Sequence, residues 1–118
     1  MIDVGFIGYS ALMGTELPAT VVARCYTSIG VFTSDVFDCE NDNVHGTGVA
    51  EAVIDMASGA NLYVSNPISA ADLQSATAWM VSQGVTVINH SVVWGWDGPG
   101  DGTSLRSNSP LKTVDFAV

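Results

Sequence analysis

Two side chains in the N-terminal half of the chain are suited to proton transfer. His45 opens the stretch His-Gly-Thr-Gly-Val-Ala, and an imidazole titrates near neutral pH. Asp3 follows two apolar residues, at a point where a strand is expected to end. A carboxylate beside one ring nitrogen fixes the tautomer of a histidine and stabilises the charge that forms when the other nitrogen takes a proton. Together, Asp3 and His45 predict the charge-orienting pair of a nucleophilic catalyst.

Each residue alone has a simpler interpretation. A single aspartate after a strand is usually a turn residue, and a histidine in the first turn of a helix usually caps or packs. The electropositive start of a helix disfavours imidazolium, which keeps a histidine there able to accept a proton. Gly46 would leave room for a neighbouring segment to approach, and Thr47 would bring a hydroxyl near the free helix amides.

The elements that position these residues follow from the hydrophobic pattern. Strands and helices are expected in alternation: strands at residues 20–26, 61–64 and 85–89, and helices at 45–58, 69–83 and 110–118. Residues 33–44 are polar and predict a surface loop. Ser69 and Asp72 have the spacing of a capping box. The alternation predicts an α/β domain with a mostly parallel sheet, in which functional residues gather at the carboxyl ends of strands.

Three segments resemble a known family. His45-Gly-Thr-Gly-Val-Ala resembles the histidine motif His-Gly-Thr-x-Val-Ala of the subtilisin-like serine proteases (subtilases, the peptidase S8 family). Ile2-Asp3-Val4-Gly5 resembles the aspartate motif of that family. Val87-Ile-Asn-His-Ser91 resembles the strand Val-Ile-Asn-x-Ser that runs beside the bound peptide, and the order of the three segments is also that of the family.

The resemblance implies a fold and a set of roles. The fold would be a three-layer, mostly parallel sheet with helices on both faces, incomplete at both ends. Residues 1–118 would form one partial catalytic domain that contains the Asp and His motifs and lacks the Ser motif. Asp3 would be the triad aspartate and His45 the general base, while Ser91 and Gly95 would lie along the substrate cleft. A polypeptide substrate, a monomeric state and no required cofactor follow from the same resemblance.

Several residues depart from the family pattern. Gly48 stands where the family commonly has a second histidine, and the segment that follows Ser91 is longer than the usual Ser-Leu-Gly. Gly102-Thr-Ser104 imitates the nucleophile motif but lacks its alanine, and it directly follows the cleft segment, so Ser104 is interpreted as a loop serine. The nucleophile is therefore expected beyond Val118, and the chain as given is expected to be inactive alone.

Charge and cysteine content limit the partners and the compartment. Three basic residues stand against twelve acidic ones, giving a net charge of -9, which excludes nucleic acid as a partner. No apolar run approaches the roughly 18 residues of a membrane-spanning helix. Cys25 and Cys39 either form a disulfide or are two buried thiols. A disulfide would agree with a secreted, extracellular protein.

The acidic loop from Asp97 to Gly102 leaves a second class of function open. Its carboxylates could serve calcium as a structural ion, although a simple turn explains the same residues. Trp94 and Trp96 follow the cleft segment and would suit a sugar-binding platform or the lining of a peptide cleft. The alternatives to a peptidase are therefore a calcium-dependent extracellular binding domain and a non-catalytic subtilase relative.

Overall fold

The computed structural model describes residues 1–94, 103–107 and 109–118. Strand β1 (Val22–Ser28) occupies the centre of the sheet, and the β-branched and aromatic residues of this segment favour that extended conformation. It pairs in parallel with β3 (Tyr63–Ser65) and antiparallel with β2 (Val31–Thr33), so the order is β2-β1-β3.

The N-terminal segment lies beside β3 although it is too short to count as a strand there. Ile2 forms single parallel bridges with Ser65 on one side and with His90 on the other. The amide of Asp3 donates to the Ser65 carbonyl at 3.1 Å, and the amide of Ser91 donates to the Ile2 carbonyl at 3.0 Å. Asp3 is therefore held by backbone hydrogen bonds at the carboxyl end of β3.

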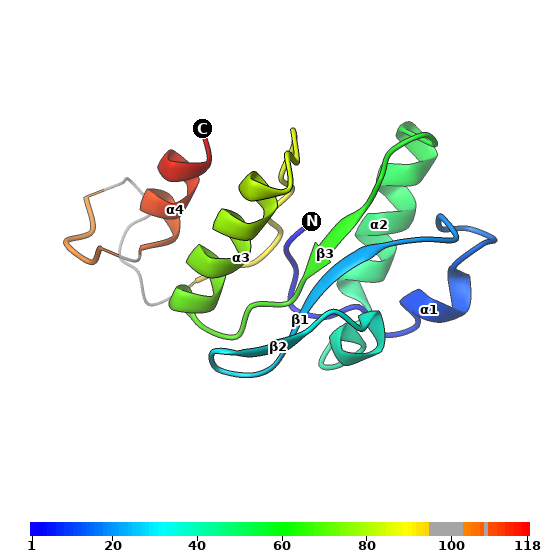
Figure 1. The fold of residues 1–118 in the computed structure, drawn as a ribbon, viewed down its shortest axis with the longest axis horizontal. Helices are drawn as coiled ribbons and strands as arrows, with labels where there is room; N and C mark the ends of the chain where they lie inside the picture. Colours follow the sequence, from blue (N-terminus) through cyan, green and yellow to red (C-terminus); the bar gives the residue numbers. More distant parts are fainter. Residues whose placement is uncertain (95–102, 108) are drawn as a thin grey trace.

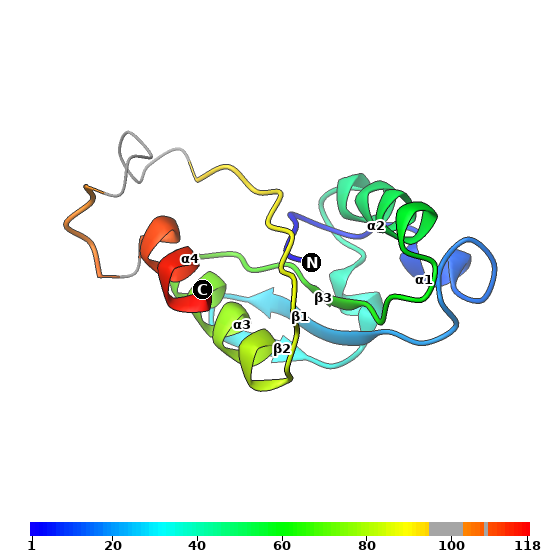
Figure 2. The same ribbon diagram turned by 90° about the horizontal axis from the view of Figure 1, so that it is seen from above.

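Two longer helices cover the sheet from opposite sides (Figure 1). Helix α2 (His45–Met56) packs Ala50 and its partly buried valines against Cys25 and Val64 of the sheet. Helix α3 (Ala70–Ser82) buries Leu73 and Met80 against Ile2. The shorter elements are α1 (Tyr9–Leu12), the 3-10 helix η1 (Val36–Cys39) and α4 (Pro110–Ala117). Figure 2 shows α4 beside α3, away from α2. In the part of the chain that is described, no helix has the length and apolarity needed to cross a membrane.

The capping box expected at Ser69 is confirmed. The Ser69 hydroxyl accepts from the Asp72 amide at 3.1 Å, and the Asp72 carboxylate accepts from the Ser69 amide at 3.0 Å. The second oxygen of Asp72 accepts from the Gly30 amide at 2.9 Å, so the start of α3 also holds the turn between β1 and β2. Asp72 is buried, and these bonds satisfy its carboxylate.

The predicted fold class is wrong. The described residues form a small α/β structure with a three-stranded mixed sheet and four α-helices. A sheet with one parallel and one antiparallel pairing is too small for the three-layer, mostly parallel subtilisin-like fold with helices on both faces, incomplete at both ends, that the sequence predicted. The physical reason is that β2 returns directly after a turn at Gly30 and pairs antiparallel with β1, which needs no crossover helix.

The strand expected at residues 85–89 also does not form. Its apolar run is not covered on both faces, because the segment runs between two cavities of about 390 and 580 Å³. Val87 is 80% exposed as a result. Among the described residues, the bridge between His90 and Ile2 is the one strand-like pairing that joins this part of the chain to its neighbours. Apolar, β-branched composition was therefore not sufficient to form a ladder.

We expect Tyr9→Phe to raise the free energy of unfolding by about 1 kcal/mol, because a buried unpaired hydroxyl carries a desolvation cost. The Tyr9 ring is fully buried, and its hydroxyl makes no hydrogen bond within the described residues. Tyr26→Phe is the matched control, since the Tyr26 hydroxyl donates to the Asp72 carbonyl at 3.1 Å. Urea denaturation should show the first variant stabilised and the second destabilised. Equal destabilisation of both would contradict this assignment.

Candidate active site

Asp3 and His45 lie in direct contact. Nδ1 of His45 is 2.9 Å from each oxygen of the Asp3 carboxylate. The carboxylate also accepts from the Val4 amide at 2.8 Å. The two residues are 42 positions apart in the sequence and come from different elements, the N-terminal segment and the first turn of α2. The structure thus brings together the two residues whose pairing the sequence predicted.

The two side chains differ in their access to solvent. The Asp3 side chain has no exposed surface, whereas 53% of the His45 side chain is exposed. A neutral His45 that donates from Nδ1 to the carboxylate leaves a lone pair on Nε2. Among the described residues, the hydrogen bonds of the His45 ring all go to Asp3. The ring therefore has one oriented nitrogen and one nitrogen able to accept a proton from outside.

Two glycines allow the Asp3 segment to approach α2. The Gly46 amide donates to the Gly5 carbonyl at 3.0 Å. A Cβ at Gly46 would lie 2.5 Å from that carbonyl oxygen, and one at Gly5 would lie 1.9 Å from the Asn41 carbonyl oxygen. Thr47 also joins α2 to the N-terminal segment, because its hydroxyl donates to the Ile7 carbonyl at 3.0 Å. The room expected at Gly46 is therefore used by the backbone that carries Asp3.

Residues 41–43 form a tight turn shortly before His45, and the sequence pattern did not indicate its role in holding that residue. Asn43 accepts from the His45 amide through its side chain at 2.9 Å and from the Ile7 amide through its carbonyl at 3.0 Å. Asp42 has a φ of 62°, in the left-handed region that residues other than glycine rarely adopt. An asparagine two residues before a helical pattern was the available signal, because Asn is a preferred cap residue.

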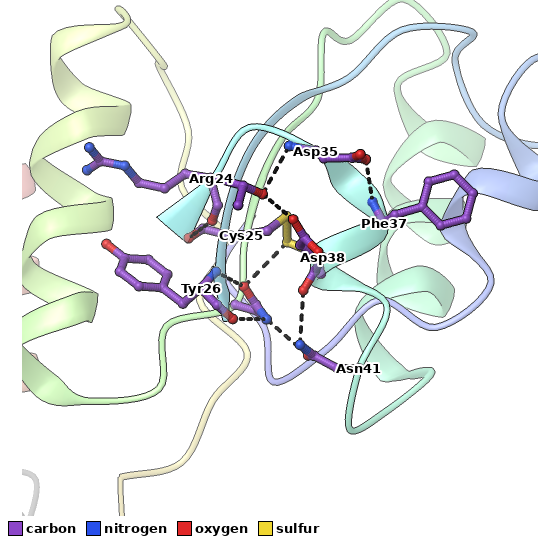
Figure 3. The surroundings of a disulfide bond; sticks show 11 residues. Arg24, Cys25, Tyr26, Asp35, Phe37, Asp38 and Asn41 are labelled. Carbon is purple, nitrogen blue, oxygen red and sulfur yellow. Dashed lines mark hydrogen bonds between the residues drawn. A yellow bond between two sulfur atoms is a disulfide. The ribbon is translucent and has the colours of Figure 1, made fainter. Parts of the chain in front are cut away.

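A disulfide joins Cys25 of β1 to Cys39 of η1 beside this turn (Figure 3). Both cysteines are fully buried. The carbonyl of Cys39 accepts from the Phe6 amide at 2.8 Å, so the bridged residue is also tied to the segment that carries Asp3. Closing a loop of this length is worth about 3 kcal/mol in the chain-entropy account of disulfides. The disulfide therefore restrains the chain shortly before His45.

A hollow of about 260 Å³ is lined in part by residues that lie close to Asp3 and His45 in the sequence. Its lining comes from four segments of the chain and includes Val4, Asp42, Ile68, Val92 and Trp94. Val4 directly follows Asp3, and Asp42 belongs to the turn before His45. The lining is more apolar than polar and includes one acidic residue, so the hollow can hold an apolar side chain of a ligand close to the segments that carry the pair.

The other predicted site residues have different outcomes. Ser91 lies beside the Asp3 segment through its bond to the Ile2 carbonyl, and its hydroxyl donates to the Asn89 side chain at 2.9 Å. Gly95 lies outside the described residues, as does the predicted calcium loop 97–102. Ser104 accepts from the nearby Arg106 amide at 3.3 Å. In both Figure 1 and Figure 2, segment 103–107 lies beyond α4, at the opposite end of the molecule from α2.

Calcium therefore stays a prediction. No group of three His, Cys, Asp or Glu side chains that could hold a metal ion occurs within residues 1–94, 103–107 and 109–118.

His90 is a second histidine near the pair, and no role was predicted for it from the sequence. Its Nε2 accepts from the indole Nε1 of Trp94 at 2.9 Å, which places the proton of the neutral ring on Nδ1. Burial lowers the pKa of His90 below 6.5, and the nearby charge of Asp3 opposes this effect. A histidine inside the apolar run 85–93 was the signal that could have identified it.

No family model, curated protein or solved structure matches the chain. The resemblance of its motifs to those of subtilases therefore remains a prediction from the sequence.

We expect Gly46→Ala to lower the free energy of unfolding by about 2 kcal/mol, because the new methyl group would overlap backbone and the Phe6 ring. Gly48→Ala is the control in the same helix. A Cβ at Gly48 meets no atom within 4 Å, so this variant should be more stable by about 1 kcal/mol through helix propensity. Thermal denaturation of the two variants measures the contrast. If Gly46→Ala were as stable as Gly48→Ala, the close approach would be refuted.

A second expectation concerns pH. Because the folded state lowers the pKa of His90, the unfolded chain binds a proton more readily than the folded one. The contribution of His90 to stability is thus fully present above the unfolded value of 6.5 and is lost as the pH falls from 6.5 toward the folded pKa. Protonation also removes the acceptor of the Trp94 indole. His90→Gln should therefore show a shallower loss of stability between about pH 7 and pH 5. If wild type and His90→Gln lost stability equally over this pH range, His90 would not be the source of the pH dependence.

Proposed function

We propose that this chain supplies the aspartate and the general base of a serine endopeptidase of the subtilase kind. Asp3 orients His45, and His45 serves a nucleophilic serine located beyond residue 118 in the full-length protein. The observation that carries this proposal is the contact between a fully buried carboxylate and Nδ1 of a half-exposed histidine.

The chemistry follows from that geometry. His45 Nε2 takes the proton of the serine hydroxyl as the serine oxygen bonds to the peptide carbonyl carbon, whose π electrons move to its oxygen. The imidazolium is stabilised by the Asp3 carboxylate, which stays ionised. When the tetrahedral intermediate collapses, the carbon–nitrogen bond breaks and Nε2 returns its proton to the leaving amine. Water then repeats the sequence on the acyl-enzyme and releases the second product.

Other features of the chain support the proposal. The hollow beside Val4 and Trp94 can hold an apolar side chain of a polypeptide substrate, and its lining includes residues adjacent in sequence to Asp3 and to the turn before His45. The order of the Asp, His and cleft motifs along the sequence is that of the family. The disulfide between Cys25 and Cys39 agrees with a secreted protein, because such bridges persist in oxidising compartments. The proposed enzyme requires no cofactor for the reaction, and calcium would act only as a structural ion.

The test uses the full-length protein that contains these residues. His45→Ala should lower kcat for hydrolysis of a peptide substrate by a factor on the order of 10⁶, as in triads where the base has been removed. Asp3→Asn should lower it by about 10⁴-fold, because the ring would adopt the wrong tautomer. Labelling by a fluorophosphonate, which reacts with activated serines, should fall in parallel.

Gly48→Ala provides the matched control, since this exposed position in α2 has open space around it. The control should keep both activity and labelling. A full-length protein that neither labels nor cleaves would favour a non-catalytic relative. Undiminished labelling of His45→Ala would show that the reactive serine depends on another base.

A further inference from the structure

We infer that Asn66 is a positioning residue for the Asp3–His45 pair, an inference that rests on the function proposed above. Asn66 directly follows Ser65, the last residue of β3, and both are buried. The Ser65 carbonyl accepts from the Asp3 amide at 3.1 Å. The adjacent Asn66 side chain holds the turn that precedes His45. Two neighbouring residues at the end of one strand thus set the separation of the two members of the pair.

The Asn66 amide group is fixed in orientation by β1. Its Oδ1 accepts from the Tyr26 amide at 2.7 Å, and its Nδ2 donates to the Tyr26 carbonyl at 3.3 Å. These bonds continue the pairing of β1 with β3 one step beyond the last backbone pair, Arg24 with Ser65. Because Oδ1 must face an N–H group, the amide cannot turn over. Its second Nδ2 hydrogen is therefore directed away from the strand.

That second hydrogen reaches the turn before His45. Nδ2 of Asn66 donates to Oδ1 of Asn41 at 3.0 Å, and Nδ2 of Asn41 donates to the Asp38 carbonyl at 2.9 Å. Figure 3 shows Tyr26, Asn41 and Asp38 grouped around the disulfide. With 2% of its surface exposed, Asn66 uses both of its donor hydrogens within this network.

The turn itself needs such external support. The Asn43 amide donates to the Asn41 carbonyl at 2.7 Å across Asp42, whose φ is 62°. A three-residue turn with a positive φ at a residue other than glycine is strained and persists only when its surroundings fix it. Asn66 fixes the first residue of this turn, and the last residue, Asn43, accepts from the His45 amide at 2.9 Å. Loss of Asn66 should therefore let the start of α2 move relative to Asp3.

The test reads the tautomer of the His45 ring by long-range proton–nitrogen NMR on the 118-residue chain, at a pH where the ring is neutral. We expect the wild-type ring to carry its proton on Nδ1, facing Asp3, and Asp3→Asn to lose that preference. Asn66→Ala should move the tautomer ratio at least half of the way toward that of Asp3→Asn. Asn41→Ala, at a half-buried position, should act in the same direction and decides the matter if Asn66→Ala does not fold.

Ser69→Ala is the control for general destabilisation, because it removes a helix cap three residues away that has no bond to the turn. It should lower the melting temperature and leave the His45 tautomer unchanged. A wild-type tautomer in both asparagine variants would overturn the inference, as would an equal change in Ser69→Ala. The NMR measurement needs no substrate, so the two proposals can fail separately. If the peptidase assay fails but the His45 tautomer still depends on Asn66, only the proposed function is rejected.

Discussion

The arrangement of this molecule depends on a carboxylate that has no contact with solvent. Burying the charge of Asp3 is costly unless donors surround it, and the Val4 amide and the His45 ring provide them. Satisfying that requirement brings the N-terminal segment against the first turn of α2, so both glycines at the contact must lack side chains. The chemistry proposed for His45 and the packing around Gly5 and Gly46 are thus two results of one constraint.

The pair is held from two sides by different kinds of interaction. The Asp3 side relies on backbone bonds to Ser65 and to the segment around His90. The His45 side relies on side chains, with Asn66 joining the turn to β1 and the disulfide fixing Cys39 close by. Backbone hydrogen bonds fix the position of Asp3 at the carboxyl end of β3. Side-chain bonds give the turn a conformation that its own residues would not favour.

The sequence predicted the contact between Asp3 and His45 because the two residue types are complementary and each has a local pattern around it. The Ser69 cap and the approximate positions of α2, α3 and α4 were predictable for the same local reason. The extent of the sheet was not predictable, since the apolar run 85–89 has strand propensity but is covered only in part: Val85 and Ile88 pack against the core, whereas Val87 is exposed. Asn66 carried no local signal, because its bonds to Tyr26 and Asn41 exist only in the folded chain.

The partners of residues 1–3 bear on the order in which the molecule folds. Each of their pairings crosses a long stretch of chain, to Ser65, to His90 and across 42 positions to His45. Closing such loops costs entropy before any contact is gained, so pairings of this kind form late. We therefore expect the β1–β2 hairpin, α2 and the disulfide loop to form first, and β3 and the N-terminal segment to dock onto them afterwards. A nascent chain would remain without its proton-transfer pair until most of its structure was in place.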